Sequence, residues 1–109
     1  MQVDLQWRGP RQPIPPDADL SAYQIIQEAV TNVIRHAGAD HCEVLIDQND
    51  RELSIEITDN GRSGVIANPG YGIVGMRERA GLLGGQLAAG PRPGGGFRVA
   101  ARLPVPATL

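Results

Sequence analysis

The segment from Asp59 to Gly75 reads Asp-Asn-Gly-Arg-Ser-Gly-Val-Ile-Ala-Asn-Pro-Gly-Tyr-Gly-Ile-Val-Gly. An alternating apolar segment with Leu53, Ile55 and Ile57 precedes it, and a segment of helical periodicity, Met76 to Leu83, follows it. A carboxylate therefore stands at the end of a strand, and glycines introduce a helix. Glycine lets the backbone approach a ligand closely, and free N–H groups at a helix N-terminus favour phosphate. The segment therefore indicates a nucleotide site.

On this interpretation Asp59 contacts the base, and the run from Gly70 to Gly75 faces the phosphates. Glycine-rich runs alone are weak signals, and a surface loop is the simpler reading of this segment by itself. The chain has no Lys, which excludes the G-x-x-x-x-G-K-[ST] loop. A dinucleotide fold also fits poorly, because Gly70-Tyr71-Gly72 does not lie in a first strand–helix turn followed by an acid about 20 residues later.

The composition is that of one soluble globular domain. The 109 residues suffice for a single core, and 41% hydrophobic with 20% charged residues is ordinary for such a domain. A net charge of −2 gives no reason to expect nucleic acid or an anionic membrane as a partner. The single cysteine, Cys42, fits a reducing cytoplasmic setting, and no apolar run approaches the roughly 20 residues of a membrane span.

Strand and helix signals alternate along the chain, with hairpins between some of them. This order predicts an α/β (α+β) two-layer sandwich with helices on one face of a mixed sheet. The expected elements are a strand over Met1–Trp7 with Trp7 inward, a helix over about Leu20–His36 capped by Asp17 or Asp19 and ended by Gly38, a hairpin that turns at Gln48–Arg51, a helix over Met76–Leu83 ended by Gly84-Gly85, and strands over Gln86–Ala89 and Phe97–Leu103.

The first expected helix has an apolar face and a polar face. The apolar face is predicted to pack on the sheet and contains Ile26, Ala29, Val30, Val33 and Ala37. The polar stripe runs at steps of three and four through Gln24, Glu28, Asn32, and Arg35 or His36.

Glu28 and Asn32 are one helical turn apart on this polar stripe. A carboxylate beside an amide oxygen suits Mg²⁺, which takes few protein ligands and keeps waters or phosphates. A solvated polar face is the simpler reading of this pair alone. Arg35 could neutralise phosphate charge, although surface arginines are common, and His36 is most simply a residue that favours the helix C-terminal dipole.

With these motifs in order, the chain closely resembles the ATP-binding catalytic domain of two-component sensor histidine kinases (the HATPase or GHKL domain). The branch that pairs with LuxR/NarL-type response regulators is the most similar, and the resemblance covers nearly all of Leu20–Pro104. The segment Gln27–Ala37, Gln-Glu-Ala-Val-Thr-Asn-Val-Ile-Arg-His-Ala, resembles that branch's N-box. This match implies that Asn32 is a Mg²⁺ ligand, and that Glu28 assists phosphoryl transfer or orients a water of the metal.

The same resemblance extends to the other motifs. Arg35, where the family commonly has Lys, and His36 are implied to lie near the phosphates. Asp59-Asn60-Gly61 resembles the G1 box, whose aspartate accepts a hydrogen bond from the adenine amino group. Gly70–Met76 resembles the G2 box at the hinge of the ATP lid. The nucleotide-binding residues implied by these two boxes are Asp59, Gly61, Gly70, Tyr71, Gly72, Ile73, Gly75 and Met76.

Three features depart from the family pattern. Ser63 occupies the second glycine position of Asp-x-Gly-x-Gly, and Phe97 stands where many members have Thr. The chain also shows no helix pair that carries a phosphoacceptor histidine. We therefore expect residues 1–109 to form one ATP-binding catalytic domain, with a core over about 18–104, that belongs to a longer kinase.

The resemblance implies a Bergerat fold, with ATP and Mg²⁺ as cofactors. It further implies transfer of the γ-phosphoryl group to a histidine on a separate dimerisation domain, a LuxR/NarL-type response regulator downstream, and a cytoplasmic position, whether or not the parent kinase is anchored in a membrane. Two alternatives remain open at this point. One is another ATPase on the same fold, such as an anti-sigma-factor serine kinase or a gyrase- or Hsp90-type enzyme, and the other is a non-catalytic nucleotide-binding domain.

Overall fold

The computed structural model describes residues 1–61 and 72–105. For His36 and Ala37 it describes the backbone and not the side chains. The elements in chain order are β1 (Gln2–Arg8), α1 (Pro16–Asn32), a π-helical turn η1 (Val33–Ala37), β2 (His41–Gln48), β3 (Glu52–Asp59), α2 (Ile73–Leu82), β4 (Gln86–Pro91) and β5 (Phe97–Pro104).

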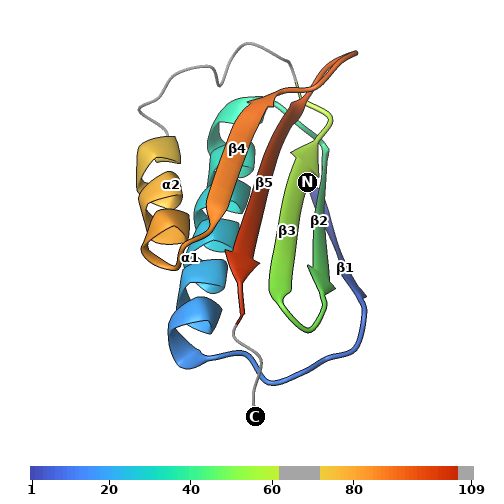
Figure 1. The fold of residues 1–109 in the computed structure, drawn as a ribbon. Coiled ribbons are helices and arrows are strands. Elements are labelled where there is room, and N and C mark those ends of the chain that lie inside the picture. Colours follow the sequence, from blue (N-terminus) through green and yellow to red (C-terminus); the bar gives the residue numbers. More distant parts are fainter. Residues whose placement is uncertain (62–71, 106–109) are drawn as a thin grey trace.

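The strands form one five-stranded sheet in the order β1-β2-β3-β5-β4. β1 is parallel to β2, and every other neighbouring pair is antiparallel. Both helices lie on the same face of this sheet, with α2 beside β4 and α1 behind the central strands (Figure 1). The predicted two-layer sandwich with a mixed, mostly antiparallel sheet is therefore confirmed.

The core lies between the helices and the inward side chains of the central strands. Val44 faces Ile57, Ile46 faces Ile55, and all four are at most 7% exposed. The next inward position on β3 is Asp59, which pairs with Cys42 across the strands. Strand alternation thus places a carboxylate on the apolar face of the sheet.

α1 begins at Pro16, and Pro15 is its N-cap, with no side-chain cap. The predicted start at Leu20 and the predicted caps Asp17 and Asp19 were therefore wrong. Proline suits the first helical position because its missing N–H would have no partner there. The two aspartates lie inside the first turn instead, where negative charge is favourable.

The buried face of α1 is centred on Ile25, with Ala18, Ala22, Ala29 and Asn32. Of the predicted apolar face, Ala29 and Val33 are buried, while Ile26 and Val30 are half-buried at its margin. The last turn is π-helical, and Gly38 follows in the left-handed conformation (φ 62°), as predicted. A π turn takes more residues than an α turn, so the polar stripe does not continue at its α-helical spacing beyond Asn32.

β1 forms one edge of the sheet. Val3 and Leu5 pair with Cys42 and Val44, so they lie on the helix face, yet they are 45% and 66% exposed. Neither helix covers this edge (Figure 1). The prediction that Trp7 points inward is confirmed, because its ring is half-buried against the core.

α2 begins before the predicted Met76, at Ile73, and its buried residues are Ile73, Met76 and Ala80. Gly84 has a φ of 76° just beyond the helix, so the predicted glycine stop is confirmed. This placement puts the N-terminus of α2 at the same end of the molecule as the C-terminal ends of α1 and β3 (Figure 1).

Candidate functional site

Three segment ends meet around one small cavity. α1 and η1 contribute Asn32 and Val33, β3 contributes Asp59, and α2 contributes Ile73. Among the residues that the structure describes, the lining consists of Ala29, Asn32, Val33, Ile57, Asp59, Ile73, Phe97 and Val99. The fold therefore brings together Asn32, Asp59 and Ile73, which the sequence had marked in three separate motifs.

Asp59 is the buried acid of this cavity, with 3% of its surface exposed. Its Oδ1 accepts a hydrogen bond of 2.7 Å from the N–H of Gly61. Among the side chains that the structure describes, no cation forms an ion pair with this carboxylate. A carboxylate accepts several hydrogen bonds, so Asp59 has the capacity to accept one from an amino group of a ligand.

Asn60 fixes the turn that carries Asp59. Its Oδ1 accepts the N–H groups of Asp40 and His41 at 3.2 and 3.1 Å, and its Nδ2 donates to Oδ1 of Asp40 at 2.6 Å. The backbone N–H of Asn60 also donates to the carbonyl of His41. The end of β3 is thereby bound to the loop that follows α1. Sequence reasoning missed this role, although Asx residues in turns commonly bond the backbone.

The loop between β4 and β5 supports the same turn from the other side. Nη1 of Arg92 donates to the backbone carbonyl of Asp59 at 3.1 Å. Gly96 has a φ of 91°, and a Cβ atom there would collide with that carbonyl oxygen. A side chain at residue 96 is therefore excluded by both backbone conformation and space. The contact of Arg92 had no signal in the sequence, because it joins residues 33 positions apart.

Glu28 lies on the exposed part of α1, one turn before Asn32. Gly72, the N-cap of α2, has a φ of 80°, and its backbone lies against the side chain of Glu28. A Cβ atom on Gly72 would come within 3.0 Å of Cδ and 3.1 Å of Cγ of that glutamate. The structure thus brings the predicted catalytic acid to the start of the predicted phosphate-facing helix.

The start of α2 presents backbone donors that have no partner within the helix. The first bond of the helix runs from the N–H of Met76 to the carbonyl of Gly72, at 3.0 Å. The N–H groups of Ile73, Val74 and Gly75 precede it and have no partner within the helix. Such groups favour an anion, and Gly75 adds no side chain that would block it.

The remaining predicted site residues either lie away from the cavity or fall outside the described residues. Met76 is 2% exposed and belongs to the core, and Arg35 is exposed on η1. Gly70, Tyr71 and Ser63 lie outside the described residues, as does the side chain of His36.

Within the described parts of the chain, no group of three or more His, Cys, Asp or Glu side chains could hold a metal ion. Glu28 and Asn32 instead supply one carboxylate and one amide on successive turns of α1. This small donor set fits Mg²⁺ because that ion commonly takes one or two protein oxygens and completes its shell with water and phosphate.

Cys42 lies beside Asp59 on the neighbouring strand and is fully buried. Burial raises the pKa of its thiol to about 11, and the negative charge of Asp59 contributes to the increase. The thiol is therefore neutral at physiological pH and serves as a small apolar residue beneath the acid.

The cavity itself is narrow, at about 10 Å³, which is close to the room that one water needs. A purine does not fit without displacement of the walls. Phe97 at the start of β5 is the largest side chain in that wall, and it is half-buried.

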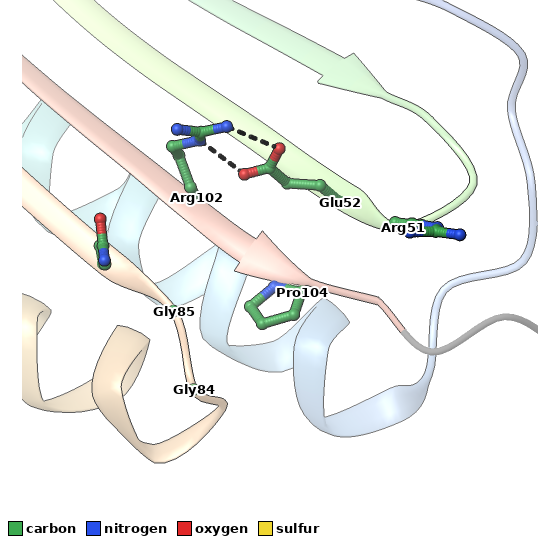
Figure 2. A pocket seen from close by; sticks show the side chains of 7 residues that line it. Arg51, Glu52, Gly84, Gly85, Arg102 and Pro104 are labelled. Atoms are coloured by element: carbon green, nitrogen blue, oxygen red, sulfur yellow. Dashed lines mark hydrogen bonds and ion pairs between the residues drawn. The ribbon is translucent and has the colours of Figure 1, made fainter.

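A wider hollow of about 310 Å³ lies at the opposite end of the sheet. It is lined by Arg51, Glu52, Gly84, Gly85, Gln86, Arg102 and Pro104 (Figure 2). Glu52 accepts hydrogen bonds from Nε and Nη2 of Arg102 at 2.6 and 3.1 Å, while Arg51 points away from this pair. Because the two charges neutralise each other, this hollow offers less to a phosphate than the start of α2 does.

Within the described residues, no helix has both the length and the apolar character required to cross a membrane.

Comparison with known proteins gives a family and relatives. Residues 17–107 match the family of histidine kinase-, DNA gyrase B- and HSP90-like ATPases. The sensor histidine kinase YxjM of Bacillus subtilis is 37% identical over 94 residues, which are 86% of this chain and 23% of that protein. The nitrate/nitrite sensor protein NarX of Escherichia coli is 31% identical over 100 residues, or 89% of this chain and 17% of that protein. The chain thus spans about a quarter or less of these relatives.

A solved structure of the ATP-binding domain of PrrB from Mycobacterium tuberculosis superposes with a TM-score of 0.67 at 22% identity. The match covers 96% of this chain and 82% of that one. The likeness shows that the fold is the Bergerat fold of histidine kinase ATPase domains.

Proposed function

The chain belongs to the family of histidine kinase-, DNA gyrase B- and HSP90-like ATPases, and from this premise we propose that it is the ATP-binding catalytic domain of a sensor histidine kinase. The observation that carries the proposal is the cavity in which Asn32 of α1 meets the buried Asp59 of β3. Its relatives among sensor histidine kinases support the same conclusion.

Asp59 is proposed to read the base. Its carboxylate is buried, it is held by the N–H of Gly61, and it retains acceptor capacity. The amino group of adenine is a donor that matches this acceptor. A base with a carbonyl at that position would place two acceptors against each other, so the site would discriminate against guanine.

The phosphates are proposed to lie at the start of α2. The free N–H groups of residues 73–75 and the helix dipole stabilise negative charge there. Arg35 on η1 and His36 are proposed to add positive charge near the same phosphates. Gly70 and Tyr71 complete the proposed phosphate and lid segment, outside the described residues.

Asn32 and Glu28 are proposed to hold Mg²⁺, which would neutralise phosphate charge when bound. The oxygen of Asn32 serves as a ligand. The carboxylate of Glu28 would orient a water or accept the proton that the attacking histidine releases, and its contact with Gly72 places it at the start of α2. Such transfer depends mainly on positioning and on charge stabilisation.

The acceptor of the γ-phosphoryl group is proposed to be a histidine on the dimerisation helices of a longer kinase. A LuxR/NarL-type response regulator would be its downstream partner, as the similarity to NarX suggests. A serine kinase of the anti-sigma-factor type would instead phosphorylate a partner protein, so the identity of the acceptor separates the two activities.

The test is calorimetric titration of ATP and ADP, with and without Mg²⁺, into the native chain and into Asp59→Asn. We expect Mg²⁺-sensitive binding of ATP that the substitution abolishes, because the amide presents a donor toward the amino group of adenine. Retained affinity in Asp59→Asn would refute the assignment of the base-reading residue. Absence of binding in the native chain would favour a non-catalytic domain.

Glu28→Gln separates binding from chemistry. We expect it to bind ATP and to fail in phosphoryl transfer to a supplied histidine domain, because the amide cannot accept a proton. Gln27→Glu is a matched control, since it changes the charge on the exposed face of α1 at the adjacent residue. If Glu28→Gln transferred phosphate at the native rate, the catalytic assignment would be wrong.

A further inference from the structure

β1 presents a free edge. Among the described strands it pairs with β2 along one side, and neither α1 nor α2 covers it (Figure 1). It contains no Pro or Gly, its charged residues are Asp4 and Arg8, and Val3 and Leu5 stay exposed on it. Such an edge is a template for another strand. We propose that β1 of a second copy of this chain pairs with it, antiparallel across a two-fold axis.

The backbone of β1 has donors and acceptors available for this pairing. The N–H of Gln2 donates to the carbonyl of Asp40 at 2.9 Å, at the side of β2. Backbone groups alternate in direction along a strand, so the even-numbered residues of β1 bond to β2. The odd-numbered residues Val3, Leu5 and Trp7 therefore direct their N–H and C=O groups to the free edge.

The charges of β1 select one register. With Gln6 on the two-fold axis, Asp4 of each copy lies opposite Arg8 of the other, in pairs without backbone bonds, where side chains come closest. With Leu5 on the axis, both charges lie opposite glutamines. With Asp4 on the axis, two carboxylates face each other. The register centred on Gln6 alone among these three pairs opposite charges.

The same register gives the apolar residues a partner. Leu5 of one copy lies opposite Trp7 of the other, and the two exchange backbone hydrogen bonds. Both side chains lie on the helix face, where Trp7 already packs against the core. Cζ of Arg11 lies over the Trp7 ring, 5.1 Å from its centroid. Pairing would cover Leu5, which is 66% exposed in the single chain.

The test is sedimentation equilibrium of the 109-residue chain over a wide range of concentration. The native chain is compared with variants in which the charges of Asp4 and Arg8 are reversed. We expect a monomer–dimer equilibrium in the native chain. Asp4→Arg and Arg8→Asp each place like charges opposite each other, so each should weaken the dimer by roughly tenfold or more. The double variant Asp4→Arg/Arg8→Asp restores opposite charges and should recover most of the native affinity.

Glu43→Arg is the matched control. Glu43 is exposed and is the β2 partner of Asp4 on the same face, one strand away from the edge. Its replacement by Arg changes the charge by the same amount as Asp4→Arg does. We expect this variant to dimerise almost as the native chain does. Because Asp4 lies 3.5 Å from Nε2 of His41, circular dichroism of each variant checks that the fold is retained.

Amide hydrogen exchange locates the contact within β1. The N–H groups of Leu5 and Trp7 should become protected as concentration rises, whereas that of Gln6 is already bonded to β2 and should change little. A chain that stays monomeric at every concentration overturns the proposal. A dimer whose affinity is the same in the native chain and in the charge-reversed variants also overturns it. The same holds for a dimer in which the amide groups that gain protection lie outside β1.

Discussion

The backbone of Gly72 lies directly against the side chain of Glu28, and this contact joins α1 to the N-terminus of α2. The two residues come from motifs 44 positions apart, and a side chain at residue 72 would displace that of Glu28. A glycine is required at residue 72 by its φ of 80° and by the position of the glutamate.

Gly72→Ala is therefore expected to lower the free energy of unfolding by about 1–3 kcal/mol, because a Cβ atom would be strained and would displace Glu28. Urea denaturation measures the change. Gly81→Ala in the same helix has open space around the new methyl group, so it should stabilise by about 0.5–1 kcal/mol. Equal effects of the two substitutions would contradict the contact with Glu28.

Asn60→Ala is expected to lower both stability and ATP affinity. It removes the hydrogen bonds that hold the Asp59 turn to Asp40 and His41, which should cost about 1–3 kcal/mol of unfolding free energy. Asn49→Ala is the comparison, because Asn49 accepts the N–H groups of Arg51 and Glu52 at the opposite end of the sheet. It should lose stability without losing ATP affinity, as calorimetry and urea denaturation would show.

Phe97→Thr is expected to bind ATP more tightly than the native chain. The smaller residue widens a cavity that is too narrow for a purine, and it introduces the hydroxyl group that many family members have at this position. Phe97→Leu keeps most of the apolar packing without a hydroxyl group, so its affinity should change less. Calorimetric titration compares the three proteins, and weaker binding by the threonine variant would mean that Phe97 contacts the nucleotide productively.

Cys42 predicts a loss of stability at alkaline pH. Burial, followed by the charge of Asp59, raises the thiol pKa from 9.0 to about 11 in the folded chain. The unfolded chain therefore releases this proton first, so the contribution of Cys42 is complete below pH 9 and is lost progressively up to about pH 11. The free energy of unfolding should fall over this range by on the order of 2 kcal/mol.

Cys42→Ala isolates that effect. Its free energy of unfolding should fall less steeply between pH 9 and pH 11 than that of the native chain, since the group that titrates differently in the two states is gone. The chain has no Lys, which leaves few other groups to titrate there. Parallel pH profiles of the two proteins would show that Cys42 is not buried beside Asp59.

Strand alternation was sufficient to place Asp59. The period of two along Leu53, Ile55 and Ile57 continues to residue 59 and accounts for a carboxylate on the inner face of β3, whereas the sequence was interpreted only as placing Asp59 at the strand's end. The meeting of Glu28, Asn32 and Asp59 at one end of the fold followed from the resemblance to a family, because periodicity gives the faces of single elements and not their mutual packing.

Other features depend on long-range packing and had weak signals. The buried face of α1 is centred on Ile25 and not on Ile26, because the packing of the helix on the sheet sets its orientation. The exposure of Val3 and Leu5 depends on how far the helices extend across the sheet. A contact such as that of Arg92 with the Asp59 carbonyl has no local pattern to reveal it.

The hydrogen bonds of Asn60 determine which loops of this chain can vary in length. The connection between α1 and β2 carries Asp40 and leads into His41, the first residue of β2, and both residues must stay at hydrogen-bonding distance from the turn after β3. An insertion in that connection would move the acid of the site, even at a distance from it in sequence. The turn between β2 and β3 lies at the other end of the sheet and can accept extra residues without this consequence.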